Sequence, residues 1–374
     1  MEYFATGVMS GTSLDGMDIC WCRFRFIDDT WTYEILAAET IPYPDTWRQR
    51  LKEAGSLPGR QLIELHNNYG HFTGNTLLDF FRRHQISNPG IVSCHGHTVF
   101  HRPDLGYTFQ LGNCAAIASK IPNMVIGDFR SLDVALKGQG APLVPVGDQL
   151  LFSDYNYCLN LGGFANISYV KHGERRAYDI CPLNFVINSL VIKQQIIDDQ
   201  SNNNNNKGHT QYLQYDPSGS LASKGRIHQP LLNKLNALDY YSKTGAKSLG
   251  AEWVDDFIWP LINEFNLKFF DSLRTFYEHI AIQIGRSFCD DPQQSALLTG
   301  GGCYNDFLIQ LIRERSPRNV SIVIADKQII ECKEALIFAF LGVLYLRGEN
   351  NCLSSVTGST RNNIGGSAYN GNII

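Results

Sequence analysis

The sequence predicts an α/β protein with two domains. Its 374 residues exceed the roughly 250 to 300 residues at which a single hydrophobic core stops growing. Apolar strand-like runs alternate with amphipathic stretches, which is typical of sheets flanked by helices. An apolar strand that ends in a glycine turn and resumes as a second strand occurs near the start and again near the middle of the chain. The same structural unit is therefore expected twice.

The first such unit surrounds the stretch GVMSGTSLDGMD, residues 7–18. Residues 17–26 then alternate, with Cys20, Cys22, Phe24 and Phe26 on one side and Arg23 and Arg25 on the other. This period of two indicates a half-buried strand, so a β-hairpin frames the glycine-rich loop. A hairpin closes with a two-residue turn, and the loop from Ser10 to Met17 is longer than closure requires. We expect the loop to hold a ligand.

The rest of the first half continues the alternation. Helical spacing runs through Leu62, Leu65, Tyr69, Phe72, Leu77, Leu78 and Phe81. Residues 91–103 indicate a strand and loop, and residues 107–113, 115–120 and 124–129 indicate strand, helix and strand. The Gly- and Pro-rich segment 133–145 is expected near a domain boundary. We therefore expect a first domain of residues 1–130 plus about 354–374, and a second of residues 131–353.

The second half repeats the opening pattern at YCLNLGGFANISYV, residues 157–170. Helices are expected over residues 251–265, around 276–288, and over 305–314 and 333–346. Strands are expected over residues 295–302 and 320–326. The asparagine-rich run 201–207 has no apolar residue and is expected to form an exposed loop.

Composition excludes several classes of function. The formal net charge is -4 with 18% charged residues, which gives no basic surface for a nucleic acid. The first residues lack a basic leader region, and the longest apolar stretch, residues 335–346, is well short of the ~20 residues that span a membrane. No pair among the ten cysteines is spaced as CxxC. We expect a soluble, cytoplasmic protein whose cysteines are reduced and buried.

Three glycine turns follow apolar runs: SGTSLDG near Gly11, LGGFAN near Gly162 and TGGGCYN near Gly300. Glycines there let backbone N–H groups approach an anion, and the third turn also opens a helix. Neither GxxxxGK[ST] nor a helix-opening GxGxxG is present, which disfavours P-loop and Rossmann proteins. The set predicts a phosphate-binding site of another kind.

In order and context these turns resemble the two phosphate turns and the adenosine turn of the actin-like ATPase superfamily, which includes sugar kinases. Within it, the chain resembles the anhydro-N-acetylmuramic acid kinases from Thr6 to about Ala368. The matching motifs are GVMSGTSLDGMD, SCHGHTVFHRP, GDFRSLDVALKGQGAPLVP, NLGGFANIS, TGGGCYND, KSLGAEW, KEALIFAF and SVTGSTR. The resemblance implies an actin-like, ribonuclease H-like fold with a nucleotide cleft between two domains, and a homodimer.

The resemblance also implies roles for individual residues. Contacts to ATP are implied for Gly11, Thr12, Ser13, Leu14, Asp15, Gly16, Met17, Asp18, Gly162, Gly163, Asn166, Gly300, Gly301, Gly302 and Asn305. Contacts to the sugar are implied for His95, His97, Thr98, Gln139, Asn184 and Glu334. Asp15 and Asp18 are expected to orient Mg²⁺ through water. Backbone N–H groups and a metal suit phosphoryl transfer, because that reaction depends on positioning and charge neutralisation.

The family's base motif, DTGPGN, reads DICPLN here. Asp179 is implied as the catalytic base, while Cys181 and Leu183 replace two glycines and leave the shape of the sugar open. Two other side-chain sets allow a second interpretation. His95, His97 and His101 could form a zinc site instead of donating hydrogen bonds to sugar. Glu334 could be an ordinary acid in the first turn of its helix.

The resemblance predicts an ATP-dependent kinase that opens 1,6-anhydro-N-acetylmuramic acid with water and phosphorylates its 6-oxygen. The product would be N-acetylmuramic acid 6-phosphate, an intermediate of cell-wall sugar recycling. Two alternatives remain: a kinase for a different 1,6-anhydro sugar, and a protein that binds ATP without chemistry.

Overall fold

The computed structural model describes residues 1–11, 14–201, 213–289 and 293–371. Most of the asparagine-rich run, residues 202–207, lies outside these ranges. The chain divides into two compact units, Met1–Ser153 with Cys332–Ile374, and Asp154–Glu331. These divisions differ from the expected ones at residues 130 and 354. The segment near residue 133 and most of the helix Lys327–Arg347 belong to the first unit.

A six-stranded sheet forms the centre of the first unit, in the order β13-β7-β4-β1-β2-β3. Strands β1 to β3 are antiparallel neighbours, and β4 and β7 continue the sheet parallel to β1. The strands are β1 (Glu2–Ser10), β2 (Gly16–Ile27), β3 (Thr30–Pro42), β4 (Ile91–Cys94), β7 (Met124–Gly127) and β13 (Ser367–Asn370). The hairpin around the opening glycine loop is therefore confirmed, and so is the alternation along β2, where Cys22 and Phe24 are buried and Arg25 is exposed.

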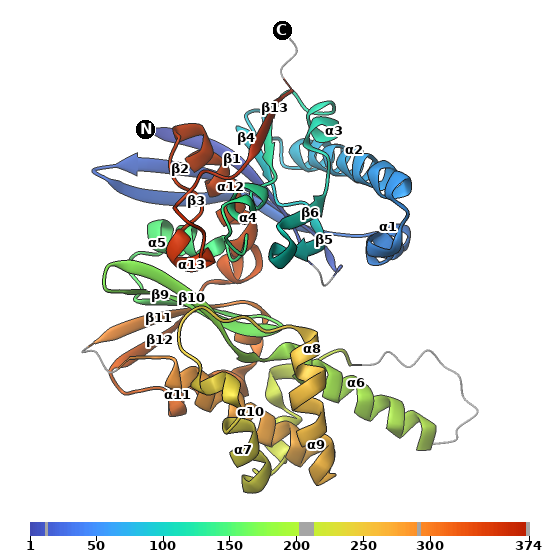
Figure 1. The fold of residues 1–374 in the computed structure, drawn as a ribbon, viewed down its shortest axis with the longest axis vertical. Coiled ribbons are helices and arrows are strands. Elements are labelled where there is room, and N and C mark those ends of the chain that lie inside the picture. Colours follow the sequence, from blue (N-terminus) through green and yellow to red (C-terminus); the bar gives the residue numbers. More distant parts are fainter. Residues whose placement is uncertain (12–13, 202–212, 290–292, 372–374) are drawn as a thin grey trace. The chain divides into compact units, whose positions relative to one another are not determined.

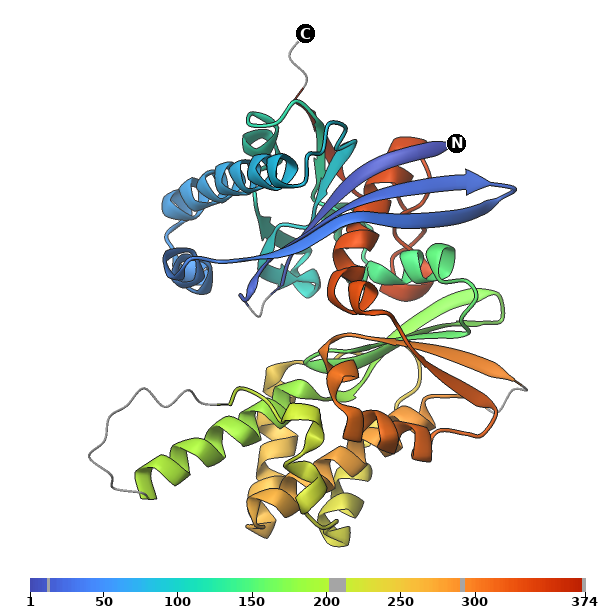
Figure 2. The same cartoon turned by 180° about the vertical axis from the view of Figure 1, so that it is seen from behind.

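Two long helices cover opposite faces of this sheet (Figures 1 and 2). Helix α2 (Gly59–Arg83) buries Leu65, Tyr69, Leu77 and Phe80 in a core shared with β1 and β2. Helix α12 (Lys327–Arg347) crosses β1 so closely that a Cβ on Gly7 would lie 1.9 Å from the carbonyl oxygen of Ala335. This packing places most of α12 in the first unit.

Shorter elements complete the first unit. They are α1 (Asp45–Glu53), α3 (Cys114–Ala118), α4 (Ser131–Ala135), α5 (Val144–Leu151), α13 (Ser354–Thr357) and the hairpin of β5 (His97–Arg102) with β6 (Tyr107–Leu111).

The second unit repeats the strand order of the first. Its five-stranded sheet runs β10-β9-β8-β11-β12, with three antiparallel strands followed by two parallel ones. The strands are β8 (Tyr157–Leu161), β9 (Phe164–Lys171), β10 (Glu174–Pro182), β11 (Gln294–Thr299) and β12 (Val320–Ile324). This duplicated order confirms the predicted α/β class and the ribonuclease H-like arrangement that the family resemblance implies.

The helices of the second unit are α6 (Asn184–Ser201), α7 (Gln229–Asn236), α8 (Ala251–Trp253), α9 (Trp259–Phe265), α10 (Phe269–Arg286) and α11 (Asp306–Arg315), with a π-helical turn at Val254–Ile258. They gather mainly below the sheet in Figure 1. Helix α10 is buried along most of its length.

All ten cysteines are free thiols, and eight of them are buried; Cys114 and Cys289 are partly exposed. Within the described ranges, none of the helices has the length and apolar character needed to cross a membrane.

Candidate functional site

The opening glycine turn joins β1 to β2 in the first unit. Thr12 and Ser13 lie outside the described residues, and Leu14 has a positive φ of 61°. Asp15 is exposed, whereas Asp18 is half-buried and accepts a hydrogen bond from the Thr40 hydroxyl at 2.6 Å. The two carboxylates that the sequence assigned to Mg²⁺ thus have different surroundings.

Met17 and Gly16 at the end of this turn are required for the packing of the first unit. The Met17 side chain is 1% exposed and belongs to the core, so only its backbone can reach a ligand. A Cβ on Gly16 would lie 2.6 Å from the Ile41 carbonyl oxygen, which means that the pairing of β2 with β3 requires glycine there. A substitution at Gly16 would disturb this strand pair as well as any phosphate contact.

The three histidines of the SCHGHTVFH segment bond to different partners. His95 follows β4 and accepts hydrogen bonds at Nε2 from Arg130, at 2.9 Å and 3.1 Å. His97 lies 3.4 Å from the Ser10 hydroxyl through Nδ1, and His101 lies 3.1 Å from the Thr108 hydroxyl. Gly96, with φ of 77°, breaks the strand between the first two imidazoles. The same-side geometry on which the zinc hypothesis rested is therefore wrong.

No group of three or more His, Cys, Asp or Glu side chains among the described residues could hold a metal ion. The pKa of both His95 and His97 is lowered by burial, and Arg130 lowers that of His95 further. Both imidazoles are therefore neutral near pH 7. A neutral ring has one N–H donor and one acceptor, which suits a polar sugar ligand.

Arg130 and Glu334 place opposite charges in the same region of the first unit. Burial raises the pKa of the Glu334 carboxyl, as does the Asp18 carboxylate, while Arg130 and Lys333 act against this rise. Burial lowers the pKa of Arg130 to about 10, so the guanidinium remains charged at neutral pH. The interpretation of Glu334 as a first-turn acid is wrong, because α12 begins at Lys327.

Gln139 lies on a loop that a buried carboxylate holds in place. Asp133 is fully buried, and its two oxygens accept hydrogen bonds from Cys352, Thr357, Asn363 and the Gly140 amide. The backbone amide of Gln139 also donates to the Thr357 carbonyl at 2.8 Å, and the Gln139 side chain is exposed. These bonds tie residues 133–140 to residues 352–363 within one unit, in place of the expected domain boundary.

Thr98, at the start of β5, is partly buried, and its hydroxyl accepts from Gln110 at 3.4 Å. A buried chain of hydroxyl groups runs from Ser10, the partner of His97, to Tyr43 and Tyr69. The oxygen–oxygen distance is 2.7 Å from Ser10 to Tyr43 and 2.5 Å from Tyr43 to Tyr69. His97 is thereby connected to a fixed polar network in the unit's interior.

In the second unit, Asn160, Asn166 and Asp179 are direct register partners across β8, β9 and β10. Residues opposite one another in antiparallel strands project from the same face, so three polar side chains line one row beside the Gly162–Gly163 turn. A β-bulge follows Asp179, between its pairing with Asn166 and that of Cys181 with Ala165. Bulges re-aim side chains and are common next to active sites.

Asp179 is half-buried and held from outside the sheet. Its Oδ2 accepts from the Leu249 amide at 2.9 Å, its carbonyl oxygen accepts from the Tyr240 hydroxyl at 2.6 Å, and its amide donates to the Lys247 carbonyl at 3.0 Å. Burial raises the pKa of this carboxyl, and the Leu249 amide partly opposes that rise. A carboxylate with a raised pKa is a stronger base than an exposed one.

Helix α6 begins directly on the second glycine turn. The amides of Leu183 and Phe185 donate to the Gly163 carbonyl, at 2.8 Å and 3.1 Å, and the Asn184 side-chain amide donates to the Leu161 carbonyl at 3.1 Å. Asn184 therefore holds the turn as well as being a candidate sugar contact.

The glycines of the third turn differ in what they require. Gly300 has φ of 84°, and a Cβ there would lie 2.2 Å from Asn160 Oδ1. Gly302 is buried against Leu161. Apart from the two chain neighbours, no atom of the described residues lies within 4 Å of the position that a Cβ on Gly301 would occupy. No packing contact among the residues that the structure describes therefore requires glycine at position 301, which leaves room for a ligand to approach.

Asn305 fixes the end of the third turn. Its Oδ1 accepts from the Leu308 amide at 3.0 Å and caps helix α11. Its side-chain amide donates to the Tyr277 hydroxyl at 2.7 Å, and that hydroxyl donates to the buried Asp216 carboxylate. A direct contact from Asn305 to nucleotide remains a prediction.

The family model of the anhydro-N-acetylmuramic acid kinases matches residues 2–371 of this chain. The chain belongs to this family. The anhydro-N-acetylmuramic acid kinase of Vibrio vulnificus (strain CMCP6) is 32% identical over 374 residues, which cover 95% of each chain. The enzyme of the same name from Chromobacterium violaceum is 31% identical, with 97% of this chain and 98% of the relative covered.

A solved structure, component A of the (R)-2-hydroxyglutaryl-CoA dehydratase of Acidaminococcus fermentans, aligns with a TM-score of 0.42 at 11% identity. The alignment covers 90% of this chain and 96% of that one.

The two residues that replace glycines of the kinase family's base motif are core residues. Cys181 and Leu183, which stand where the motif has glycines, are both fully buried in the hydrophobic core of the second unit. Cys181 pairs with Ala165 and not with a residue of the row that carries Asp179, and Leu183 follows the end of β10. The added bulk is absorbed by packing, so it gives no reason to expect a different sugar.

Sequence reasoning missed three polar residues of the candidate site: Arg130, Asn160 and Ser10. Each stands inside a motif that the kinase resemblance covers, GDFR, NLGG and GVMSG. Arg130 bonds to His95, 35 positions away, and Ser10 bonds to Tyr43, 33 positions away. Asn160 pairs with Asn166, six positions away. Only the polar character of Asn160 between apolar strand residues was a local signal.

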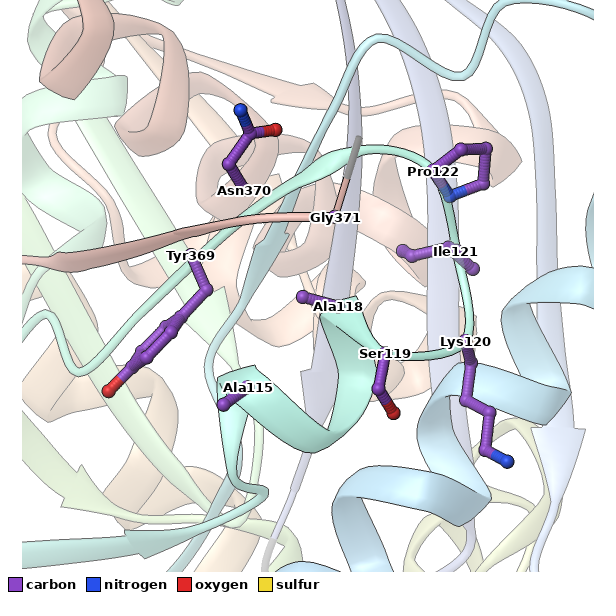
Figure 3. Close-up of a pocket in the computed structure, with 9 residues that line it drawn as sticks. All are labelled: Ala115, Ala118, Ser119, Lys120, Ile121, Pro122, Tyr369, Asn370 and Gly371. Atoms are coloured by element: carbon purple, nitrogen blue, oxygen red, sulfur yellow. The ribbon is translucent and has the colours of Figure 1, made fainter. Parts of the chain in front are cut away.

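Figure 3 shows an open pocket in the first unit of about 560 Å³. It is lined by Ala115, Ala118, Ser119, Lys120, Ile121, Pro122, Tyr369, Asn370 and Gly371. None of the candidate catalytic, ATP or sugar residues lines it, so it is a separate feature from the sites described above.

Proposed function

We propose that this protein is an ATP-dependent kinase that opens 1,6-anhydro-N-acetylmuramic acid with water and phosphorylates the freed 6-oxygen. The family membership gives the reaction class. The observation that carries the assignment within this chain is Asp179, a half-buried carboxylate at a β-bulge with one oxygen bonded to a backbone amide. The product is N-acetylmuramic acid 6-phosphate, and the role is recycling of cell-wall sugars.

In the proposed reaction Asp179 accepts a proton from water while the water oxygen attacks the anomeric carbon. The bond from that carbon to the 6-oxygen breaks as the new carbon–oxygen bond forms. The 6-oxygen then attacks the γ phosphate of ATP, and ADP leaves. Asp179 must be ionised to act, so turnover falls as the pH drops through its raised pKa.

The glycine turns are the proposed ATP contacts: the opening turn, with residues 11–18, and the turns around Gly162 and Gly301. Open space at the Cβ position of Gly301 supports backbone contact there, and a Cβ on Gly163 would meet only Phe185, at 3.9 Å. Asp15 and Asp18 are the proposed Mg²⁺ residues. Asp18 raises the pKa of Glu334, a sign of crowded negative charge that a cation would relieve. Bound Mg²⁺ would supply neutralisation of phosphate charge.

The sugar contacts proposed from the family are His95, His97, Thr98, Gln139, Glu334 and Asn184. Arg130 joins this set because an acidic sugar needs a cation near its carboxylate, and Arg130 is held by His95 and the Gly140 carbonyl. We propose a homodimer from the family resemblance alone, and a cytoplasmic location from the composition of the first residues and the apolar stretches.

The decisive experiment is turnover in ¹⁸O-labelled water with ATP and the anhydro sugar, analysed quickly by mass spectrometry. We expect ADP, and one ¹⁸O at the anomeric carbon with none in the phosphate ester. A parallel panel lacking the lactyl or acetamido group tests the sugar. ATP binding without turnover of any anhydro sugar would support the silent binding protein instead, and turnover without label in the sugar would rule out hydrolytic opening.

A further inference from the structure

A loop of the second unit closes on itself through one lysine. Residues 239–242 form a 3₁₀ turn, and the chain then continues to Gly250 before helix α8 begins. The Lys247 ammonium donates to the carbonyl oxygens of Lys243 at 2.9 Å and Tyr240 at 3.1 Å. It also lies 4.6 Å from the centroid of the Tyr240 ring. Lys247 therefore joins the two ends of the loop.

This loop takes the place of a missing neighbour strand. Strand β10 is the edge of its sheet, so the outward backbone groups of Asp179 have no strand partner. The loop supplies the partners: the Lys247 carbonyl accepts from the Asp179 amide, and the Tyr240 hydroxyl donates to the Asp179 carbonyl. The Leu249 amide then bonds to Oδ2 of the side chain. A single loop thus fixes both the backbone and the carboxylate of Asp179.

The near end of the loop is anchored to a buried helix. Tyr241 shares a hydrogen bond of 2.9 Å with His279 Nε2, and His279 Nδ1 lies 2.7 Å from Asn236 Oδ1. His279 is fully buried on α10, and burial lowers its pKa to about 3, so the ring stays neutral. With this end fixed to α10, the position of Leu249 depends on how the far end closes, which is the contact that Lys247 makes.

We propose that Lys247 is a positioning residue for Asp179. By closing the loop, its ammonium holds the Leu249 amide against Oδ2 of the carboxylate, which orients Oδ1 toward the reacting water. This inference rests on the proposed role of Asp179 as the base. It assigns Lys247 no contact with substrate and no proton transfer of its own.

Tyr178 and Cys181 lie on β10 with Asp179, and the loop and the start of α8 carry the other titratable groups of this set: Tyr240, Tyr241, Lys243, Lys247 and Glu252. Burial raises the pKa of the tyrosine and cysteine members, so they stay protonated through the acidic range. Glu252 is the other carboxyl in this set, and Glu252→Gln is the control for it.

The test compares Lys247→Met with Lys247→Arg and Lys243→Met. Methionine keeps much of the length and apolar character of lysine and removes the donors. We expect kcat to fall about tenfold to a hundredfold, because displacing a reacting group by an ångström has effects of this size. The acidic limb of the kcat profile should move to higher pH, since the lost amide bond is the one that lowers the Asp179 pKa. ATP affinity, measured by calorimetry, should stay at the wild-type value.

The companion variants separate positioning from loss of charge or of stability. Lys247→Arg can still donate to both carbonyls and should recover most of kcat with a wild-type limb. Lys243→Met removes a positive charge from the same loop, where the hydrogen bonds of Lys243 come from its backbone amide and carbonyl, and should behave as wild type. Glu252→Gln should leave the limb where it is.

A Lys247→Met enzyme with wild-type kcat and an unshifted acidic limb would overturn the inference, and so would a lower kcat with an unshifted limb, which would indicate a merely structural role. If Lys247→Met does not fold, Tyr240→Phe removes one bond to Asp179 and must show a smaller shift in the same direction. Asp179→Asn is run in parallel. An active Asn variant would remove the proposed base itself, whereas an inactive Asn variant beside an unaffected Lys247→Met would reject only the role of Lys247.

Discussion

The two sheets share one strand order but hold their acids differently. In the first unit Met9, Asp18 and Thr40 are register partners across the hairpin strands, one step before the glycine turn. In the second unit the equivalent row is Asn160, Asn166 and Asp179. The acid stands on the middle strand in one sheet and on the edge strand in the other. Asp18 bonds to a hydroxyl of its own sheet, whereas Asp179 bonds to a loop from outside.

This difference teaches how a duplicated scaffold can separate binding from proton transfer. An acid on an inner strand has neighbours on both sides, so its surroundings are set by the sheet. An acid on an edge strand has one side free for elements from outside the sheet. Here a bulge follows Asp179, and a loop packs against it and supplies the Leu249 amide. A raised pKa and a fixed direction follow from that placement.

The largest expected effect is the loss of kcat when Asp179, the acid on the edge strand, is replaced. Asp179→Asn keeps the shape of the side chain and its acceptor oxygen, but it removes the proton acceptor. We expect kcat to fall roughly 100-fold to 10,000-fold, the usual range for losing a positioned base, with ATP binding intact. Asp18→Asn is the matched variant in the first sheet, and we expect its main effect on the KM for ATP. Equal losses of kcat in both variants would show that the two acids are not separated in role.

The second prediction uses the glycines of the second unit. Gly301→Val places a branched side chain where no protein atom lies within 4 Å, so the fold should be unaffected. ATP affinity should fall about tenfold or more, equivalent to ~1.4 kcal/mol, because the side chain would occupy space left for the ligand. Gly59→Val is the control, since that exposed helix-start glycine also has no atom within 4 Å. Calorimetry should give a wild-type affinity for the control. A wild-type affinity for Gly301→Val would remove the third turn from the ATP site.

Local patterns sufficed to predict the hairpins at the first two glycine turns and the helices α2, α3, α9, α10 and α11, whereas α1, α5, α6 and α7 were not predicted. The alternation along β2 and the helical spacing along α2 are set by the residues of those segments themselves, and both are confirmed. The start of α12 was misplaced by six residues: the continuous apolar run begins after Lys333, whereas the helix begins at Lys327.

Long-range pairing could not be predicted from local patterns. The bond between Arg130 and His95 joins residues 35 positions apart, and the bond between Leu249 and Asp179 joins residues 70 positions apart. Such contacts depend on how β7 reaches β4 and how a loop packs on an edge strand, which no local period encodes. Likewise, the sequence did not indicate the bulge after Asp179 or the burial of Cys181 and Leu183.

The smallest expected effect concerns Thr40, the residue that gives Asp18 its partner within the sheet. Thr40→Val keeps the β-branched shape and removes only the hydroxyl that donates to Asp18 Oδ1. A single hydrogen bond contributes about 0.5–1.5 kcal/mol net, so we expect the KM for ATP to rise about twofold to tenfold with little change in kcat. Thr32→Val, an exposed threonine on the same strand, is the control and should match wild type. If Thr40→Val lowers kcat instead and shifts its acidic limb, then Asp18 shares in proton transfer, and the division of labour between the two sheets is wrong. If it raises only the KM, a hydroxyl within the sheet orients a binding acid in the first unit, as an amide from outside the sheet orients the base in the second.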